Sequence, residues 1–292
     1  MLQDDWQLTD GVDAFLAQVG DFLRSRPALH TTPLTDIEKL RTRRANEHDA
    51  SAAVFGRLES EGEVRAIFYR TPRGRLGLTS LSTEQAGHLA AQLAELGHSP
   101  TNVIADHDTA TAFAEAWQQH AGTRPEPFWQ THLHRLGILT PPQPPPEGQG
   151  RIAGGKDREQ VMRWCREFCT GVGEQTSIDL IDAGSWDGSR FSDRHFTLWE
   201  TPNGHPVSMA AATSIVGGMI RVDPVYTPAH LRGRGYAGAV TAETSRAALT
   251  AGATDVALFT DPANPTSNAL YQRIGYVHIS DFTGYTFSYD AP

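Results

Sequence analysis

The spacing of apolar positions changes several times in the first half of the chain, which predicts alternating helices and strands. At Val12–Leu23 apolar residues recur every three or four positions, as on a helix that buries one face. Further helices are expected at 83–96 and 109–120, and strands at 52–58, 64–69, 76–81, 103–105 and 128–138. This half of the chain therefore predicts a mixed α/β domain.

The second half repeats the same order of elements with clearer signals. The pattern predicts helices at 156–169, 236–251 and 266–274, and strands at 195–201, 206–212, 219–226, 255–260, 276–280 and 283–289. Pro202-Asn203-Gly204 is typical of a hairpin turn, and Gly252 ends a helix. Both halves give helix, three antiparallel strands, helix, strand, helix, strand, so we expect a structural duplication.

A proline-rich segment marks the boundary between the two halves. Five of the six residues from Pro141 to Pro146 are proline, which favours an extended, semi-stiff spacer. We therefore expect a first domain at 1–140, a linker at 141–150 and a second domain at 151–292.

Composition excludes some classes of function. A net charge of −9 argues against non-specific binding to nucleic acid or anionic membranes. The acidic start Met1-Leu2-Gln3-Asp4-Asp5 is unlike a signal peptide, and the weakly polar run 208–220 is too short to span a bilayer. We expect a cytoplasmic protein.

Cysteine and histidine do not predict a metal site. Cys165 and Cys169 are four residues apart in a helical pattern, a poor starting geometry for a disulfide, and no ligand set surrounds them. Two free cysteines fit a reducing compartment. His132 and His134 are expected to lack carboxylate or cysteine partners.

The segment between strand 219–226 and the following helix carries the strongest chemical signal. Gly233 and Gly235 remove β-carbons that would keep a ligand away from the main chain. The first N–H groups of the helix then point at one spot, at the positive end of its dipole. Arg232 and Arg234 add donors suited to phosphate. The segment predicts a pyrophosphate cradle.

A second polar motif follows strand 255–260. Asn264-Pro265 is typical of a helix start, because proline in the first turn gives up no hydrogen bond. Asn268 and Tyr271 are three apart and share one helix face, whereas Leu270 and Ile274 face the core.

In this order and about thirty residues apart, the two motifs resemble those of the GNAT superfamily of acetyl-CoA-dependent N-acetyltransferases. Arg232, Gly235 and Ala237 match its pyrophosphate loop, and Asn264, Asn268 and Tyr271 match its second motif. The resemblance covers residues 151–292 and implies two tandem GNAT-like domains of the α/β (α+β) class. Each would be a mixed antiparallel and parallel sheet flanked by helices, the first being degenerate.

The resemblance also implies roles for single residues. The backbone of Val225, Tyr226 and Thr227 would pair with the pantetheine arm beside a bulge at Pro224. The positions implied to hold the pyrophosphate are Arg232, Gly233, Arg234, Gly235, Tyr236 and Ala237. Asn264 and Asn268 would bind the cofactor arm, and Tyr271 would act as general acid.

The group that takes the proton from the acceptor amine is less well defined. Glu200, at the end of strand 195–201, and Asp223, beside the expected bulge, are both candidates. We favour Glu200 because that strand end can face the acceptor. Asp261 is assigned to the turn before Asn264.

In the first half, Leu81-Ser82-Thr83-Glu84-Gln85 starts a capped helix without glycine, so we expect no cofactor there. The reading is acetyl transfer from acetyl-CoA to a primary amine, on a small molecule or a protein, by direct attack in a ternary complex. The alternatives are a non-catalytic CoA-binding regulatory module and a transferase with another acyl donor. A homodimer stays open.

Overall fold

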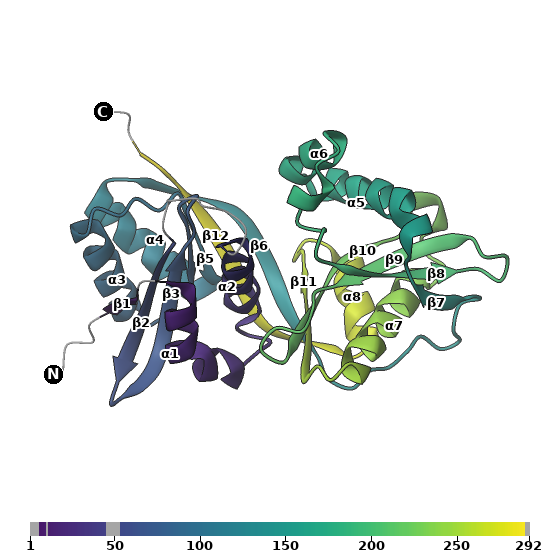
Figure 1. Cartoon of the computed structure of the whole chain (residues 1–292), viewed down its shortest axis with the longest axis horizontal. Helices are drawn as coiled ribbons and strands as arrows, with labels where there is room; N and C mark the ends of the chain where they lie inside the picture. The colour runs from purple at the N-terminus through teal and green to yellow at the C-terminus, as the bar shows by residue number, and fades with distance from the viewer. Residues whose placement is uncertain (1–5, 10, 45–52, 290–292) are drawn as a thin grey trace. The chain divides into compact units, whose positions relative to one another are not determined.

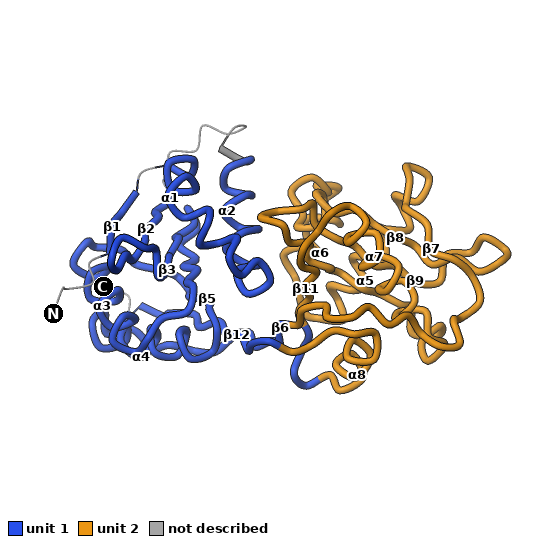
Figure 2. The backbone as a smooth tube through the Cα atoms, turned by 90° about the horizontal axis from the view of Figure 1, so that it is seen from below, with its two compact units in different colours: residues 1–133, 260–263, 279–292 blue, residues 134–259, 264–278 orange. Residues whose placement is uncertain are grey.

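The computed structural model describes residues 6–9, 11–44 and 53–289 and divides the chain into two compact units. Unit 1 comprises residues 1–133, 260–263 and 279–292, and unit 2 comprises 134–259 and 264–278 (Figure 2). The units are therefore interleaved in sequence, unlike the contiguous domains 1–140 and 151–292 expected from the proline-rich boundary. Among the described residues, no helix combines the length and apolar character needed to cross a bilayer.

Unit 1 is a mixed sheet with helices on both faces. Its strands are β1 (Trp6–Thr9), β2 (Val54–Ser60), β3 (Glu63–Arg70), β4 (Arg75–Leu78) and β5 (Asn102–Asp106), with parts of β6 (Arg124–Leu136) and β12 (Tyr276–Ser288). The first four pair antiparallel, β4 and β5 are parallel, and β5 pairs antiparallel with β12. The fold class predicted from the apolar pattern is confirmed.

The helices of unit 1 are placed by their apolar stripes. They are α1 (Val12–Ser25), α2 (Thr31–Arg44), α3 (Thr83–Glu95) and α4 (His107–Ala121). In α1, Phe15, Val19 and Leu23 are fully buried, and the Phe15 ring stacks on Phe55 of β2 at 4.9 Å. On the opposite face, α3 and α4 pack a core that includes Trp117.

Unit 2 has the same arrangement (Figure 1). Its strand order is β7 (Gln149–Ile152), β8 (His195–Glu200), β9 (Pro206–Ala212), β10 (Met219–Tyr226), β11 (Asp255–Thr260) and the end of β6. Helices α5 (Arg158–Val172) and α6 (Gln175–Asp182) pack one core, and α7 (Tyr236–Thr250) and α8 (Pro265–Arg273) pack the other. Short 3-10 turns lie at Gly155–Asp157, Trp186–Gly188 and Ala229–Leu231.

Each unit completes its sheet with a strand from the other half of the sequence. In unit 1, Phe282–Thr286 of β12 pair with β5. In unit 2, the end of β6 lies next to β11. The two strands expected at 276–280 and 283–289 form one strand of 13 residues, β12. This exchange of last strands is why the compact units are interleaved.

Several elements depart from the sequence reading. Helices α2 and α6 and strands β1 and β7 were not expected. Residues 149 and 150, assigned to the linker, belong to β7. The proline-rich segment is packed rather than free: the Thr140 N–H donates to the Ile274 carbonyl, and the Trp199 indole donates to the Glu147 carbonyl.

Candidate active site

The site lies where β10 and β11 separate. These parallel strands pair only at Met219, Ile220 and Arg221. On its other edge, β10 pairs with β9, and the register of this pair shifts between Val222 and Val225. Pro224 lies within this interval and has no N–H to donate to β9. The bulge predicted at Pro224 is therefore present, and it leaves the second halves of β10 and β11 unpaired with each other.

The three positions predicted to pair with the cofactor arm follow this bulge. Val225 and Tyr226 lie opposite Ala210 and Met209 of β9. The Thr227 side chain hydrogen-bonds the Ser208 hydroxyl at 2.8 Å, and the Thr227 carbonyl accepts from Arg232 Nε at 3.0 Å. These contacts fix the end of β10 from the β9 side and join it to the loop that follows.

The cradle predicted from the sequence corresponds to the loop from Arg232 to Gly235. Gly233 and Gly235 have φ values of +76° and +82°, in the left-handed region that favours glycine. A β-carbon at Gly233 would meet no atom within 4 Å. Helix α7 begins at Tyr236 with Gly235 as its N-cap, and no side chain caps it. Its first N–H groups are therefore available to an anion.

The corresponding junction in unit 1 is built differently. The Ser82 hydroxyl caps α3 by accepting from the Gln85 N–H, and the Gln85 side chain accepts from the Ser82 N–H. The Leu81 N–H donates to the fully buried Thr109 hydroxyl at 2.8 Å. The polar groups at this junction thus have partners within the protein, in contrast to those at the start of α7.

The second motif is divided between two roles. Asn264 is the N-cap of α8, and its side chain accepts from the Ser267 N–H at 3.1 Å. Asn264 therefore has a capping role that the sequence analysis did not assign to its side chain. Asn268 and Tyr271 follow on α8, both partly buried. The Tyr271 ring packs edge-to-face on Tyr276, with ring centroids 6.0 Å apart.

Burial and charge act together on Tyr271. Desolvation raises the pKa of its phenol above the ordinary value of 10, and the negative charge of Asp223 raises it further. The Tyr271 hydroxyl therefore keeps its proton at neutral pH.

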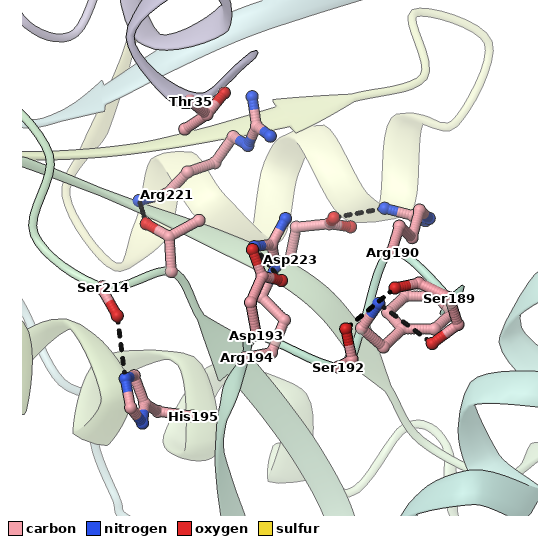
Figure 3. Close-up of polar contacts among 12 residues, drawn as sticks. Thr35, Ser189, Arg190, Ser192, Asp193, Arg194, His195, Ser214, Arg221 and Asp223 are labelled. Atoms are coloured by element: carbon pink, nitrogen blue, oxygen red, sulfur yellow. Dashed lines mark hydrogen bonds and ion pairs between the residues drawn. The ribbon is translucent and has the colours of Figure 1, made fainter. Parts of the chain in front are cut away.

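Asp223 belongs to a network of charged side chains (Figure 3). It forms an ion pair with Arg190, which lies 2.7 Å from Glu174 through its Nε. Burial alone would raise the pKa of Asp223, but the charges of Arg190, Arg194 and Arg221 outweigh it and lower that pKa. Asp223 is thus a stable carboxylate.

The favoured base, Glu200, is in a different environment. It lies on β8, two strands from β10 in the sheet order, which corresponds to about 10 Å. Its carboxylate is 2.6 Å from Arg151 Nε, and Arg151 also binds Asp157. The hydrogen bonds from Arg151 lower the pKa of Asp157 to about 2. Glu200 is thus engaged by Arg151, whereas Asp223 is the carboxylate whose charge raises the pKa of Tyr271.

Arg190 and Glu174 were missed by the sequence analysis. Arg190 lies in an irregular segment before β8, and Glu174 directly precedes α6. A third contact between segments is the Tyr226 hydroxyl, which donates to Glu167 of α5 at 2.6 Å. Burial, followed by the Glu167 interaction, raises the pKa of Tyr226 to about 12. No spacing in the sequence signals these long-range pairs.

The remaining titratable groups have other roles. Cys165 and Cys169 are buried free thiols, and desolvation raises the pKa of Cys169 to about 12, so neither is a reactive nucleophile. The expectation that His132 lacks a carboxylate partner is wrong: its Nδ1 lies 2.5 Å from Asp281 Oδ1. β6 and β12 bring these distant positions together.

Comparison with known proteins agrees with this geometry. The family model for FR47-like protein matches residues 210–284, which include both motifs. No curated protein matches the sequence. A GCN5-related N-acetyltransferase from Sphaerobacter thermophilus is similar in structure, with a TM-score of 0.57 at 17% identity over 100% of this chain and 98% of the other.

Two further solved structures have the same fold. One is a tandem GNAT protein from the clavulanic acid biosynthesis pathway, with a TM-score of 0.53 at 13% identity over 99% of both chains. The other is a GNAT-family acetyltransferase from Colwellia psychrerythraea, with a TM-score of 0.51 at 10% identity over 97% of this chain and 100% of the other. The fold is that of tandem GNAT proteins.

Proposed function

We propose that this protein is an acetyl-CoA-dependent N-acetyltransferase whose reaction takes place in unit 2. The observation that carries the proposal is the uncapped start of α7 beside the separated ends of β10 and β11. A helix N-terminus with free N–H groups binds phosphate, and an unpaired strand edge binds an extended amide chain. CoA contains both, joined in one molecule.

The residues present fit this cofactor. Gly233 and Gly235 admit the pyrophosphate close to the main chain, and Tyr236 and Ala237 supply the first N–H groups of α7. Val225–Thr227 would pair with the pantetheine arm beyond the bulge. Asn268 would contact that arm from α8. Acetyl-CoA would supply an acyl group activated as a thioester.

Tyr271 is proposed as the general acid. Its raised pKa keeps the phenol protonated at neutral pH, so it can donate a proton to the departing sulfur. Its packing against Tyr276, whose hydroxyl bonds Ser245 at 2.8 Å, holds the ring in place.

Asp223 is proposed as the carboxylate that faces the acceptor amine. A carboxylate with a lowered pKa is a weak base, so its expected role is electrostatic: it would stabilise the positive charge that develops on the attacking nitrogen. The acceptor is a primary amine on a small molecule or a protein. Proton release to water then completes the transfer.

The test is a thermal-shift titration with acetyl-CoA, CoA and a longer acyl-CoA. A ligand at about 100 times its Kd should stabilise the folded protein by roughly 2.7 kcal/mol. Gly235→Glu should abolish this shift by placing a charged side chain at the cradle. Gly252→Glu is the matched control, because Gly252 also has positive φ, with open space around it, but lies at the far end of α7.

The outcomes separate the alternatives. A shift in wild type and Gly252→Glu only, with acetyl transfer to an amine panel, supports the proposal. A larger shift with the longer acyl-CoA points to another donor, and a shift without turnover points to a non-catalytic CoA-binding module. No shift with any ligand, for folded protein, would overturn the cofactor assignment.

A further inference from the structure

The proline-rich segment before β7 is held in place at both of its ends. Before it, the Thr140 N–H donates to the Ile274 carbonyl at 3.0 Å. After it, the Glu147 carbonyl accepts from the Trp199 indole at 3.0 Å. Both partners belong to unit 2, so the segment is a strap fixed across this unit rather than a free connection.

The strap lies against the first turn of α7 and its N-cap. A β-carbon placed on Gly238 would be 3.2 Å from Pro142 Cγ, closer than an ordinary contact. One placed on Gly235 would be 3.7 Å from Pro146 Cβ and Cγ. Gly235 and Gly238 therefore leave the space that the two prolines fill.

Exposure separates the prolines of the strap into two kinds. Pro142 and Pro146 are partly buried, whereas Pro141, Pro144 and Pro145 are exposed. The partly buried pair is the pair that lies beside Gly235 and Gly238. The strap thus lies against the N-cap and first turn of α7 through two of its five prolines and presents the other three to solvent.

We propose that Pro142 and Pro146 are positioning residues of the pyrophosphate site, which hold the Gly233–Gly235 loop and the first turn of α7 ready for phosphate. This inference rests on the proposed function. Proline suits this role because its backbone has no N–H that could bind the phosphate in place of the N–H groups of α7. Its ring also limits the conformational entropy that the segment loses when it is ordered.

The need for such support follows from the loop itself. Residues 232–235 are exposed, and the two glycines give the backbone wide conformational freedom. A loop ordered before binding loses less entropy when the ligand arrives, so the affinity for CoA should depend on the strap. Removing the proline rings should weaken binding at the phosphate end of the ligand.

The experiment compares two double variants by calorimetric titration with CoA. Pro142→Ala/Pro146→Ala removes the two contacts, and Pro141→Ala/Pro145→Ala removes two exposed prolines from the same segment. We expect the first double variant to raise the Kd for CoA about tenfold, which corresponds to about 1.4 kcal/mol of binding free energy. The second double variant should leave the Kd within about twofold of wild type. Pantetheine, which lacks the phosphates, should bind all three proteins alike.

The results distinguish this inference from the proposed function. If wild type does not bind CoA, the proposed function fails, and this inference fails with it. If wild type binds CoA and both double variants bind equally well or weaken equally, the inference alone is overturned. If Pro142→Ala/Pro146→Ala does not fold, Gly238→Ala replaces it. The added β-carbon should displace Pro142 and so also weaken CoA binding. Unchanged binding in this variant would refute the role of the strap.

Discussion

Replacing Arg190 by methionine tests the charged network beside the proposed site without assuming any activity. Arg190 lies between Asp223 and Glu174, and its guanidinium is 4.5 Å from the centre of the Phe191 ring. The side chains of Arg190, Glu174 and Asp223 are 31%, 30% and 25% exposed, so the network is neither open to solvent nor fully enclosed.

The expected loss follows from this intermediate burial. Exposed ion pairs contribute up to about 1 kcal/mol to the free energy of unfolding. Removing one partner of a buried pair lowers that free energy by about 3–5 kcal/mol. Methionine keeps the apolar contact with Phe191 but leaves two carboxylates uncompensated. We expect the free energy of unfolding to fall by about 2–3 kcal/mol, which corresponds to a melting temperature lower by roughly 4–12 °C.

Arg166→Met is the matched control. Arg166 binds Asp182 with two short hydrogen bonds, but both side chains are 47% exposed. This substitution should change stability little, because solvent screens the pair. Urea unfolding at neutral pH, followed by circular dichroism, measures both variants. Equal losses in the two proteins would refute the reasoning that burial gives the Arg190 network its weight.

Three further predictions concern chemistry and use acetyl transfer to a responsive amine as the assay. Tyr271→Phe should lower turnover by about 10²-fold or less with the Kd for CoA near wild type, and unchanged turnover would show that Tyr271 is not the acid. Because burial raises the pKa of Tyr271 above 10, the turnover of the wild type should show no loss from deprotonation of this group below pH 10. A loss of turnover with a midpoint near pH 8 that disappears in Tyr271→Phe would contradict the assignment. Asp223→Asn should lower turnover more than Glu200→Gln, since the charge of Asp223 acts on Tyr271 whereas Glu200 is engaged by Arg151. The reverse order would favour Glu200 as the base.

The sequence predicted the mixed α/β fold and most elements of unit 2, because local signals define them. Gly233 and Gly235 mark the cradle, Pro265 marks the start of α8, and Pro224 marks the bulge in β10. Such features depend on the conformational limits of single residues. They can therefore be identified without knowledge of distant partners.

The parts that were missed depend on pairings between distant positions. Arg190 reaches Asp223, 33 residues away, and Thr140 bonds Ile274. Helix α2 has few apolar positions, so its periodicity is weak. The neighbour of Glu200 could not be foreseen either. Arg151 lies opposite Leu198 on β8 and its guanidinium contacts Glu200, a contact that depends on the pairing of β7 with β8.

The exchange of last strands has a consequence for how the protein is made. Residues 279–288 of β12 are synthesised after the rest of unit 2, yet Phe282–Thr286 pair with β5, which was synthesised some 180 residues earlier. Unit 1 therefore cannot close its sheet until β12 has been made, and until then β5 has an open edge, a state prone to aggregation. Cutting the gene at the proline-rich segment would give two fragments, each lacking a strand, whereas co-expression of both could let them complete each other.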